Sequence, residues 1–214
     1  MVDPRALFEC ILWLRGVFSA CGFEFQYSDL AARTHIQRFD IGLDSGRPVA
    51  DGVPSVVFDC TGMLHDGLVR DCGHWGGKSI GDTYIRHTHV VYHGTKNLEG
   101  VLRCNGVMHE AQNTCAGKRG WFHSKSLSQA YGYASTVQGF KVVLKFHSRC
   151  FHSCEGGRSW YYTKADCRNY VIAGIILIPD TASLPLLSST FRIVLPAFDL
   201  RHSLCMQPPW GFPI

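Results

Sequence analysis

Residues 89–106 read His-Val-Val-Tyr-His-Gly-Thr-Lys-Asn-Leu-Glu-Gly-Val-Leu-Arg-Cys-Asn-Gly. The β-branched run from His89 to Tyr92 predicts a strand that stops at His93-Gly94-Thr95. A short helix over 96–104 is predicted next, and Asn105-Gly106 is typical of a helix end. This stretch therefore predicts one strand followed directly by one short helix.

The same alternation continues on both sides of this stretch, and strands outnumber helices. The predicted strands lie at 55–59, 141–146, 170–178 and 190–195. The predicted helices lie at 4–16 or 4–22, at 28–34 and at 127–133. We therefore expect an α+β protein whose sheet is mostly antiparallel, with short helices between the strands.

Composition supports one packed domain. The chain has 214 residues, of which 46% are hydrophobic, 12% aromatic and 18% charged. This content excludes an intrinsically disordered chain, which needs low hydrophobicity and a high net charge. Domains run to roughly 100–200 residues, so one domain or one with a small extension is predicted. We assign 1–88 to an N-terminal helical and loop-rich β extension that packs on a core at 89–214.

Charge and cysteine content indicate an intracellular protein. Lys and Arg number 21 against 17 Asp and Glu, a net charge of +4, and they do not cluster as in most nucleic-acid-binding proteins. Ten cysteines fall short of the roughly 8–10% that marks a disulfide scaffold. We find no secretory signal and no run of about 18 uncharged apolar residues. The expectation is mostly reduced thiols, a cytoplasmic or nuclear location and no membrane contact.

The segment from Tyr92 to Tyr133 carries the chemistry. A glycine between His93 and Thr95 lets a ligand approach the backbone closely. Ser128 and Tyr131 are three residues apart, which places a hydroxyl and an aromatic ring on one face of a helix. Together these groups predict a clamp for a planar heteroaromatic ring.

In order, the chain presents His93-Gly94-Thr95, Asn105-Gly106, Gly120-Trp121-Phe122 and Ser128-Gln-Ala-Tyr131. This order resembles the catalytic domain of the poly(ADP-ribose) polymerase-like ADP-ribosyltransferases, over roughly residues 90–178. The resemblance implies a split, mostly antiparallel β core and NAD as the co-substrate.

The resemblance also implies roles for the matching residues. His93 would bond the adenosine ribose, the Gly94 backbone and the Ser128 hydroxyl would hold the nicotinamide amide, and Tyr131 would stack on nicotinamide. Thr95 belongs to the same motif and is expected among the NAD-binding residues. Trp121 falls where the family has a second stacking tyrosine, so the ring is kept and the hydroxyl is lost.

Asn169 departs from the family pattern. It precedes the predicted strand at 170–178, where the polymerase-type enzymes carry a catalytic glutamate. An amide can bond a ribose hydroxyl but cannot act as a general base at pH 7. The departure favours transfer of one ADP-ribose to a protein or nucleic-acid acceptor, or a module that binds NAD without chemistry. Glu110 and Glu155 are carboxylates that spacing alone does not place.

Two other enzyme classes remain as alternatives. The RNA 2′-phosphotransferases share the His-Gly-Thr strand end and carry histidine in their second motif, as at His123, together with arginines for the RNA phosphate. The arginines available here are Arg86, Arg103 and Arg119. Cys72-Gly73-His74-Trp75 is similar to part of the papain-type cysteine protease motif but lacks its second cysteine.

The sequence leaves two further alternatives: a zinc site, and purely structural roles for the candidate site residues. Zinc is possible at a segment rich in histidine and cysteine, but the spacing differs from a standard zinc finger, so we expect no metal. The residues concerned are His147, Cys150, His152, Cys154 and Cys167. Each site candidate also fits a structural role: a strand-end histidine at 93, core rings at 121, 122 and 131, and a polar strand start at 169.

Overall fold

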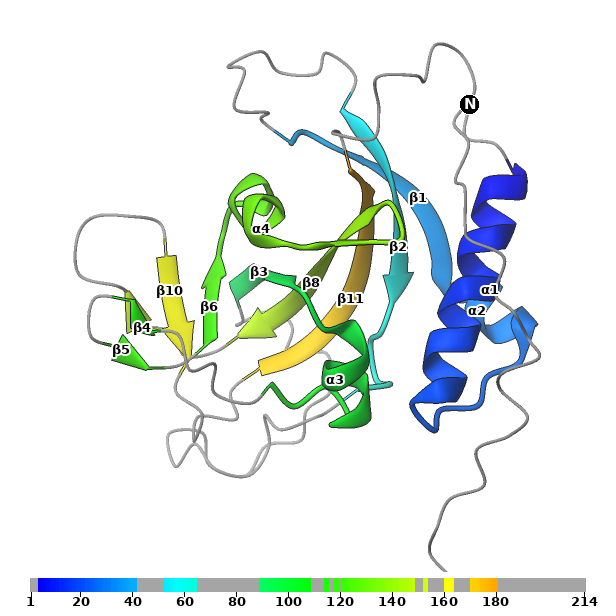
Figure 1. The fold of residues 1–214 in the computed structure, drawn as a ribbon, viewed down its shortest axis with the longest axis horizontal. Helices are drawn as coiled ribbons and strands as arrows, with labels where there is room; N and C mark the ends of the chain where they lie inside the picture. Colours follow the sequence, from blue (N-terminus) through cyan, green and yellow to red (C-terminus); the bar gives the residue numbers. More distant parts are fainter. Residues whose placement is uncertain are drawn as a thin grey trace, which may run out of the picture.

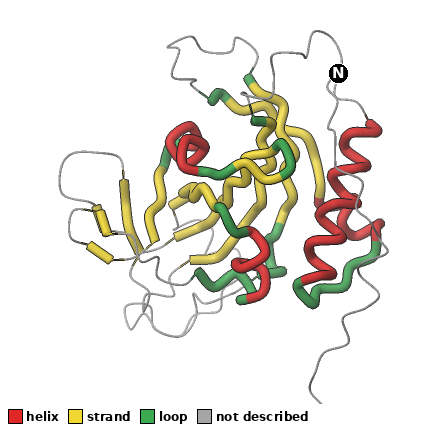
Figure 2. Tube along the Cα trace, in the orientation of Figure 1, coloured by secondary structure: helices red, strands yellow, loops and turns green. Residues whose placement is uncertain are grey.

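The computed structural model describes residues 4–41, 52–64, 89–108, 114–115, 118–119, 121–148, 152–153, 160–163 and 170–180. Within these residues one nine-stranded sheet forms the centre, with helices beside it (Figures 1 and 2). Every strand pair in it is antiparallel. The prediction of an α+β fold with a mostly antiparallel sheet is confirmed.

The strands do not follow the chain in order across the sheet. The order is β1 (Thr34–Phe39), β2 (Val53–Asp59), β11 (Tyr170–Pro179), β8 (Phe140–Ser148), β3 (His89–Thr95), β6 (Trp121–Ser124), β10 (Trp160–Thr163) and β9 (His152–Ser153). Strand β7 (Thr136–Val137) also pairs with β8, and β4 (Thr114–Cys115) pairs with β5 (Lys118–Arg119) in a separate ribbon. The strand that ends in His-Gly-Thr therefore lies between β8 and β6.

The middle of the sheet is apolar on both faces. Nine of the ten residues of β11 are buried, and the three-residue run Val142 to Leu144 in β8 is fully buried. Such runs are typical of strands that are covered on both sides. Helices therefore have to lie on both faces, and they do.

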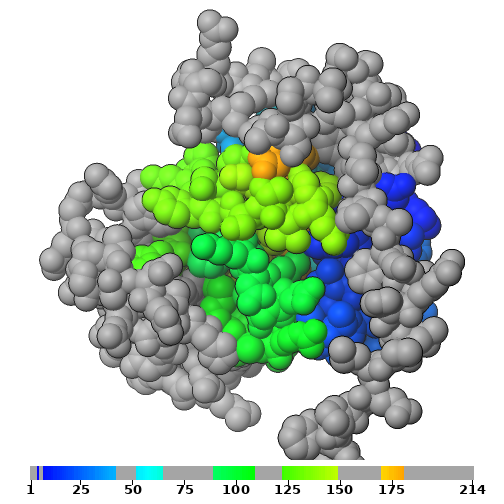
Figure 3. All heavy atoms as spheres, viewed as in Figure 1, coloured from blue at the N-terminus to red at the C-terminus, as the bar shows by residue number. Residues whose placement is uncertain are grey.

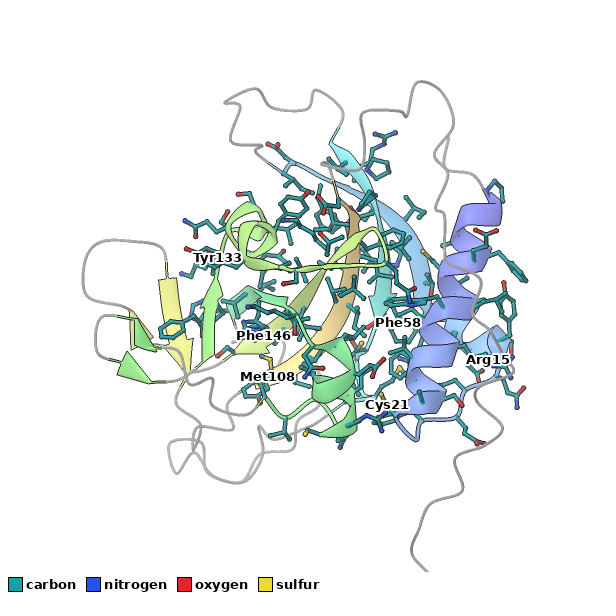
Figure 4. The ribbon with its side chains drawn as sticks, in the orientation of Figure 1. Arg15, Cys21, Phe58, Met108, Tyr133 and Phe146 are labelled. Carbon is teal, nitrogen blue, oxygen red and sulfur yellow. The ribbon has the colours of Figure 1, made fainter. Side chains whose placement is uncertain are left out.

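Four helices form the two outer layers of the described chain: α1 (Pro4–Ala20), α2 (Tyr27–Arg33), α3 (Leu98–Arg103) and α4 (Leu127–Tyr133). Residues of α1, α2 and α3 pack with Leu144 and Phe146 on one face of the sheet. Residues of α4 pack with Val143 and Ile176 on the other face. Phe58 and Phe146 lie on the face of the sheet that α1, α2 and α3 cover, and Tyr133 is exposed on α4 (Figure 4).

Local sequence explains where the two helices near the site begin and end. The side chains of Asn97 and Ser126 accept hydrogen bonds from the first turns of α3 and α4, as N-cap residues do. After α3 the chain reverses through Asn105 and Gly106, which have φ values of 52° and 76°. Glycine and asparagine adopt this left-handed conformation most readily, so the predicted helix end is confirmed.

Most other element predictions that fall on described residues are confirmed. Strands occur at 55–59, 141–146 and 170–178, and helices occur within 4–22, near 28–34 and at 127–133. The strand expected at 190–195 lies outside the described residues. Strands β1 and β2 belong to the same sheet as β3, so the described part of 1–88 continues the core sheet. The domain boundary we assign at 88/89 adjoins 65–88, which are not described.

Candidate functional site

The two edges of β3 are paired very differently. On the β8 side the register runs along the whole strand, from His89 opposite Ser148 to Thr95 opposite Val142. On the β6 side the described register is a single pair, Tyr92 opposite Ser124. Antiparallel pairing, if it continued, would bring Gly94 opposite Phe122. The regular pairing instead ends just before the glycine, and we call this end of the pairing the parting of β3 and β6.

The His93 side chain lies at this parting. Its Nδ1 atom is 2.6 Å from the carbonyl oxygen of Phe122 in β6. A carbonyl can only accept, so Nδ1 carries the proton and donates it, and Nε2 keeps the ring's lone pair. Burial lowers the pKa of His93, while the hydrogen bond to Phe122 acts in the opposite direction and is the weaker cause. The ring is therefore neutral at pH 7, with Nε2 as an acceptor suited to a hydroxyl group.

Gly94 is a glycine because α4 lies against it. A Cβ atom on Gly94 would overlap the carbonyl oxygen of Ala130 and the amide nitrogen of Ala134, both backbone atoms. Neither atom can move without displacing the helix. The interpretation from sequence, in which the glycine makes room for a ligand, is therefore incomplete. The residue first makes room for the helix that carries Ser128 and Tyr131.

The start of α4 is held by a chain of hydroxyl groups. Ser126 Oγ caps the helix by accepting from the Gln129 amide and is 2.8 Å from Ser128 Oγ. The Ser126 amide in turn donates to Ser124 Oγ at the end of β6, over 2.9 Å. Ser128 itself is half-buried. Its hydroxyl is thus fixed relative to the strand that parts from β3.

The Tyr131 ring lies in the core under α4. The residue is 7% exposed and packs in a cluster with Val57, Val143 and Ile176. The ammonium of Lys141, at the start of β8, lies over the ring at 4.6 Å from its centroid. The same Nζ atom donates to the Tyr131 carbonyl oxygen over 3.4 Å. One face of the ring therefore carries a cation supplied by the chain itself.

The sheet separates two of the predicted ligand contacts. Successive residues of a strand point to opposite faces, and paired residues share a face. His93 is opposite Leu144, which packs towards α1 and α3, whereas Gly94 is opposite Val143, which packs under α4 with Tyr131. A ligand that touches both His93 and Tyr131 must therefore cross the sheet at the parting of β3 and β6.

Three further residues are predicted in the site from the sequence: Thr95, Trp121 and Asn169. Thr95 is buried, and its Oγ1 accepts from the Asn97 amide, so its hydroxyl helps to turn the chain into α3. Trp121 opens β6, and only its backbone is described. Asn169 lies outside the described residues. Its neighbour Tyr170 is opposite Ser148, which is itself opposite His89 rather than His93.

The histidine of the phosphotransferase alternative faces away from α4. His123 is fully buried, and its ring meets the Phe146 ring edge-on with centroids 5.2 Å apart. Phe146 belongs to the layer under α1 and α3. Of the three arginines, Arg103 is exposed on α3, Arg119 is described only in its backbone, and Arg86 lies outside the described residues.

Cysteine and metal chemistry find little support in the described part of the chain. Cys10, Cys21 and Cys60 form no disulfide, and burial together with the Glu9 charge raises the pKa of Cys10 to about 12. Such a thiol is not a nucleophile at neutral pH. Cys72 and His74 of the protease motif, and Cys150, Cys154 and Cys167 of the zinc alternative, lie outside the described residues. Among those described, no three metal-binding side chains gather.

Two residues of this site are not predicted from the sequence. In the sequence Lys141 is simply a lysine at the start of a predicted strand, and Ser126 is one of several serines. A Ser-x-Ser pair before a predicted helix is a signal for the cap, but no spacing rule places Lys141 over Tyr131.

In the described residues no helix is long and apolar enough to cross a membrane. No protein-family model matches the chain, and no curated protein matches it in sequence. Figure 3 shows the segments 89–108 and 121–148, which supply it, side by side on one face of the molecule.

Proposed function

We propose that this protein is an NAD-dependent mono-ADP-ribosyltransferase that binds nicotinamide where β3 parts from β6. The observation that carries the proposal is the parting at Gly94, with α4 packed directly on that glycine. It brings the Gly94 backbone next to the helix that carries Ser128 and Tyr131. Where the regular pairing of a strand ends, its backbone N–H and C=O groups can hydrogen-bond a carboxamide instead of the next strand.

Different residues of the chain would bind different parts of NAD. Gly94 and Ser128 would hold the nicotinamide amide, and the Tyr131 ring would restrain the nicotinamide ring. His93 Nε2, an acceptor because Nδ1 donates to Phe122, would accept a hydrogen bond from the adenosine ribose. Asn169 would bond a hydroxyl of the nicotinamide ribose. Trp121 would line the same site, whereas the Thr95 hydroxyl is engaged in the turn into α3.

In the reaction the bond between C1′ of the ribose and nicotinamide nitrogen breaks, and its electron pair leaves with nicotinamide. The departing ring becomes neutral, so it needs no acid. The ribose develops oxocarbenium character, and an acceptor side chain or nucleic-acid group attacks C1′ and loses a proton to solvent. Holding the ring and the ribose in place supplies the rate enhancement through orientation.

A second function is favoured by Asn169, which replaces the glutamate of the resembling family. In that case the chain binds NAD and releases no nicotinamide. Binding alone would still stabilise the folded state, because a ligand that binds only the native form raises its stability by RT ln(1 + [L]/Kd).

One experiment separates these functions. The full chain is incubated with NAD, and nicotinamide release and thermal unfolding are measured together, with Ser128→Ala as the matched variant. Release that falls in the variant supports the transferase. Protection from unfolding without release supports the binding module. Neither release nor protection at millimolar NAD contradicts both functions.

A further inference from the structure

Lys141 occupies a face of the ring that the proposed function needs. Its ammonium lies 4.6 Å from the centroid of the Tyr131 ring. A cation within about 6 Å of an aromatic centroid is attracted by the negative face of the ring. The nicotinamide ring of NAD is also a cation, and it would be attracted to the same face for the same reason. The two cations cannot occupy that face together.

Lys141 is also the neighbour that can leave. Other residues of the cluster that contains Tyr131, such as Val57, Val143 and Ile176, are buried core side chains of the sheet. Lys141 is half-buried, at the edge of this cluster and at the start of its strand. A lysine has a long flexible stem and can carry its head group into water. The Lys141 side of the ring is therefore the side on which a planar ligand could stack without opening the core.

We propose that Lys141 is a specificity-determining residue that competes with the nicotinamide cation for the face of the Tyr131 ring. This inference rests on the proposed function. The lysine holds the site closed without NAD, and NAD binds only after it has displaced the ammonium. The affinity for NAD is then lower than the stacking contact alone would give, and it depends on the charge at residue 141.

A purely structural role for Lys141 makes the opposite prediction. Its hydrogen bond to the Tyr131 carbonyl joins β8 to the end of α4, where a cation is favourable. If Lys141 only anchored the helix, removing its charge would loosen α4 and weaken NAD binding. The direction of the change in NAD affinity therefore separates the two roles.

The test is calorimetric titration of the full chain with NAD and with nicotinamide, which is neutral. Lys141→Met removes the charge and keeps the stem, and Lys141→Gln removes the charge but keeps a donor for the Tyr131 carbonyl. We expect both variants to bind NAD about 2- to 30-fold more tightly than the wild type, the range of one cation–π contact. Their increase in affinity for nicotinamide should be smaller, because nicotinamide is neutral and the substitution relieves no charge repulsion.

Two controls use the same strand and the same charge. Lys145→Met removes a lysine that is opposite Tyr92 in the register, on the same face of β8, and it leaves NAD affinity unchanged. Lys141→Arg keeps the cation, and its affinity for NAD should stay close to that of the wild type. Melting temperatures recorded alongside show which variants are folded.

The outcomes also separate this inference from the proposed function. If the wild type binds NAD and the folded Lys141→Met and Lys141→Gln variants bind it equally or more weakly, the competition is overturned and the function stands. If folded wild type and folded variants all fail to bind NAD, the proposed function fails, and the inference fails with it.

Discussion

The two edges of β3 show how one strand serves two purposes. On the β8 side all its residues are paired, and the run Val142 to Leu144 in the strand beyond is fully buried. On the β6 side the register is one pair, and a histidine ring spans to the neighbouring strand where the next pair would stand. We refer to these as the closed edge and the open edge. The closed edge fixes the position of the strand in the sheet, and the open edge is where we propose that a ligand binds.

The two edges are also stabilised by different kinds of interaction. Residues of the closed edge are stabilised by burial, at roughly 25 cal/mol per Å² of apolar surface. At the open edge the contact is the imidazole bond to Phe122, and α4 beside it is held by the hydroxyl groups of Ser126 and Ser128 and by the cation that Lys141 extends from β8. Such contacts stabilise less but position groups more specifically. Substitutions at the two edges should therefore have separable effects.

The largest expected effect is on the closed edge. Leu144 is fully buried opposite His93, and Leu144→Ala should lower the free energy of unfolding by about 2–5 kcal/mol. Denaturant unfolding measures the loss. Val90→Ala is the control on β3, because Val90 is 39% exposed and its removal should change stability by at most about 0.5 kcal/mol. Equal losses in the two variants would contradict a packed closed edge.

The next effect is at the contact between β3 and α4. Gly94→Ala places a methyl group against the backbone of Ala130 and Ala134 and should destabilise the fold by about 1–3 kcal/mol or more. It should also remove NAD binding, since α4 has to move. Gly132→Ala is the control in α4, because nothing lies within 4 Å of the added methyl. Helix propensity predicts up to about 1 kcal/mol of stabilisation there. A Gly94→Ala protein with normal stability and NAD affinity would refute the contact.

A smaller effect is expected for the His93 ring. His93→Ala removes the donor to the Phe122 carbonyl and the acceptor proposed for the ribose. The loss of one such bond amounts to about 0.5–1.5 kcal/mol, or about 1–3 when a buried partner loses its bond. NAD affinity should fall about 3- to 100-fold, which calorimetry measures. Unchanged affinity, with only a lower melting temperature, would assign His93 to the fold alone.

The smallest effect is the pH dependence that the same histidine brings. Burial lowers the pKa of His93 in the folded state, whereas the unfolded chain keeps a value of about 6.5. Below pH of about 6.5 the unfolded state binds more protons, so stability falls as the pH falls towards the folded-state pKa. His93→Gln, which does not titrate, should flatten this decline in thermal unfolding. The pKa of His147 is also lowered, by burial and by Lys145, so this residue should contribute to the decline in the same direction, and His147→Gln is the comparison.

Much of the fold follows from sequence because its signals are local. The helix at 127–133 and the strand at 141–146 follow from the apolar pattern of their own residues. The end of α3 follows from Asn105-Gly106 in the same way. These elements would be expected from their own residues in any fold.

The arrangement of the site does not follow from sequence, because it depends on contacts between distant segments. Gly94 suggests close approach, but only the structure shows that the approaching group is the backbone of α4. Periodicity places Tyr131 on a helix face and does not show that Lys141 covers its ring. The opposite orientations of His93 and Gly94 follow from strand alternation, whereas the parting of β3 from β6 depends on long-range pairing.

Nicotinamide titration of the ¹⁵N-labelled full chain, followed by amide NMR, tests the open edge most directly. Nicotinamide is the smallest group that should occupy the parting, and each amide reports on its own position. We predict saturable shifts at Gly94, Ser128 and Tyr131, with Leu144 and Phe146 on the closed edge nearly unchanged. Shifts confined to other parts of the chain, or no saturable shift at millimolar nicotinamide, would contradict a ligand site at the parting of β3 and β6.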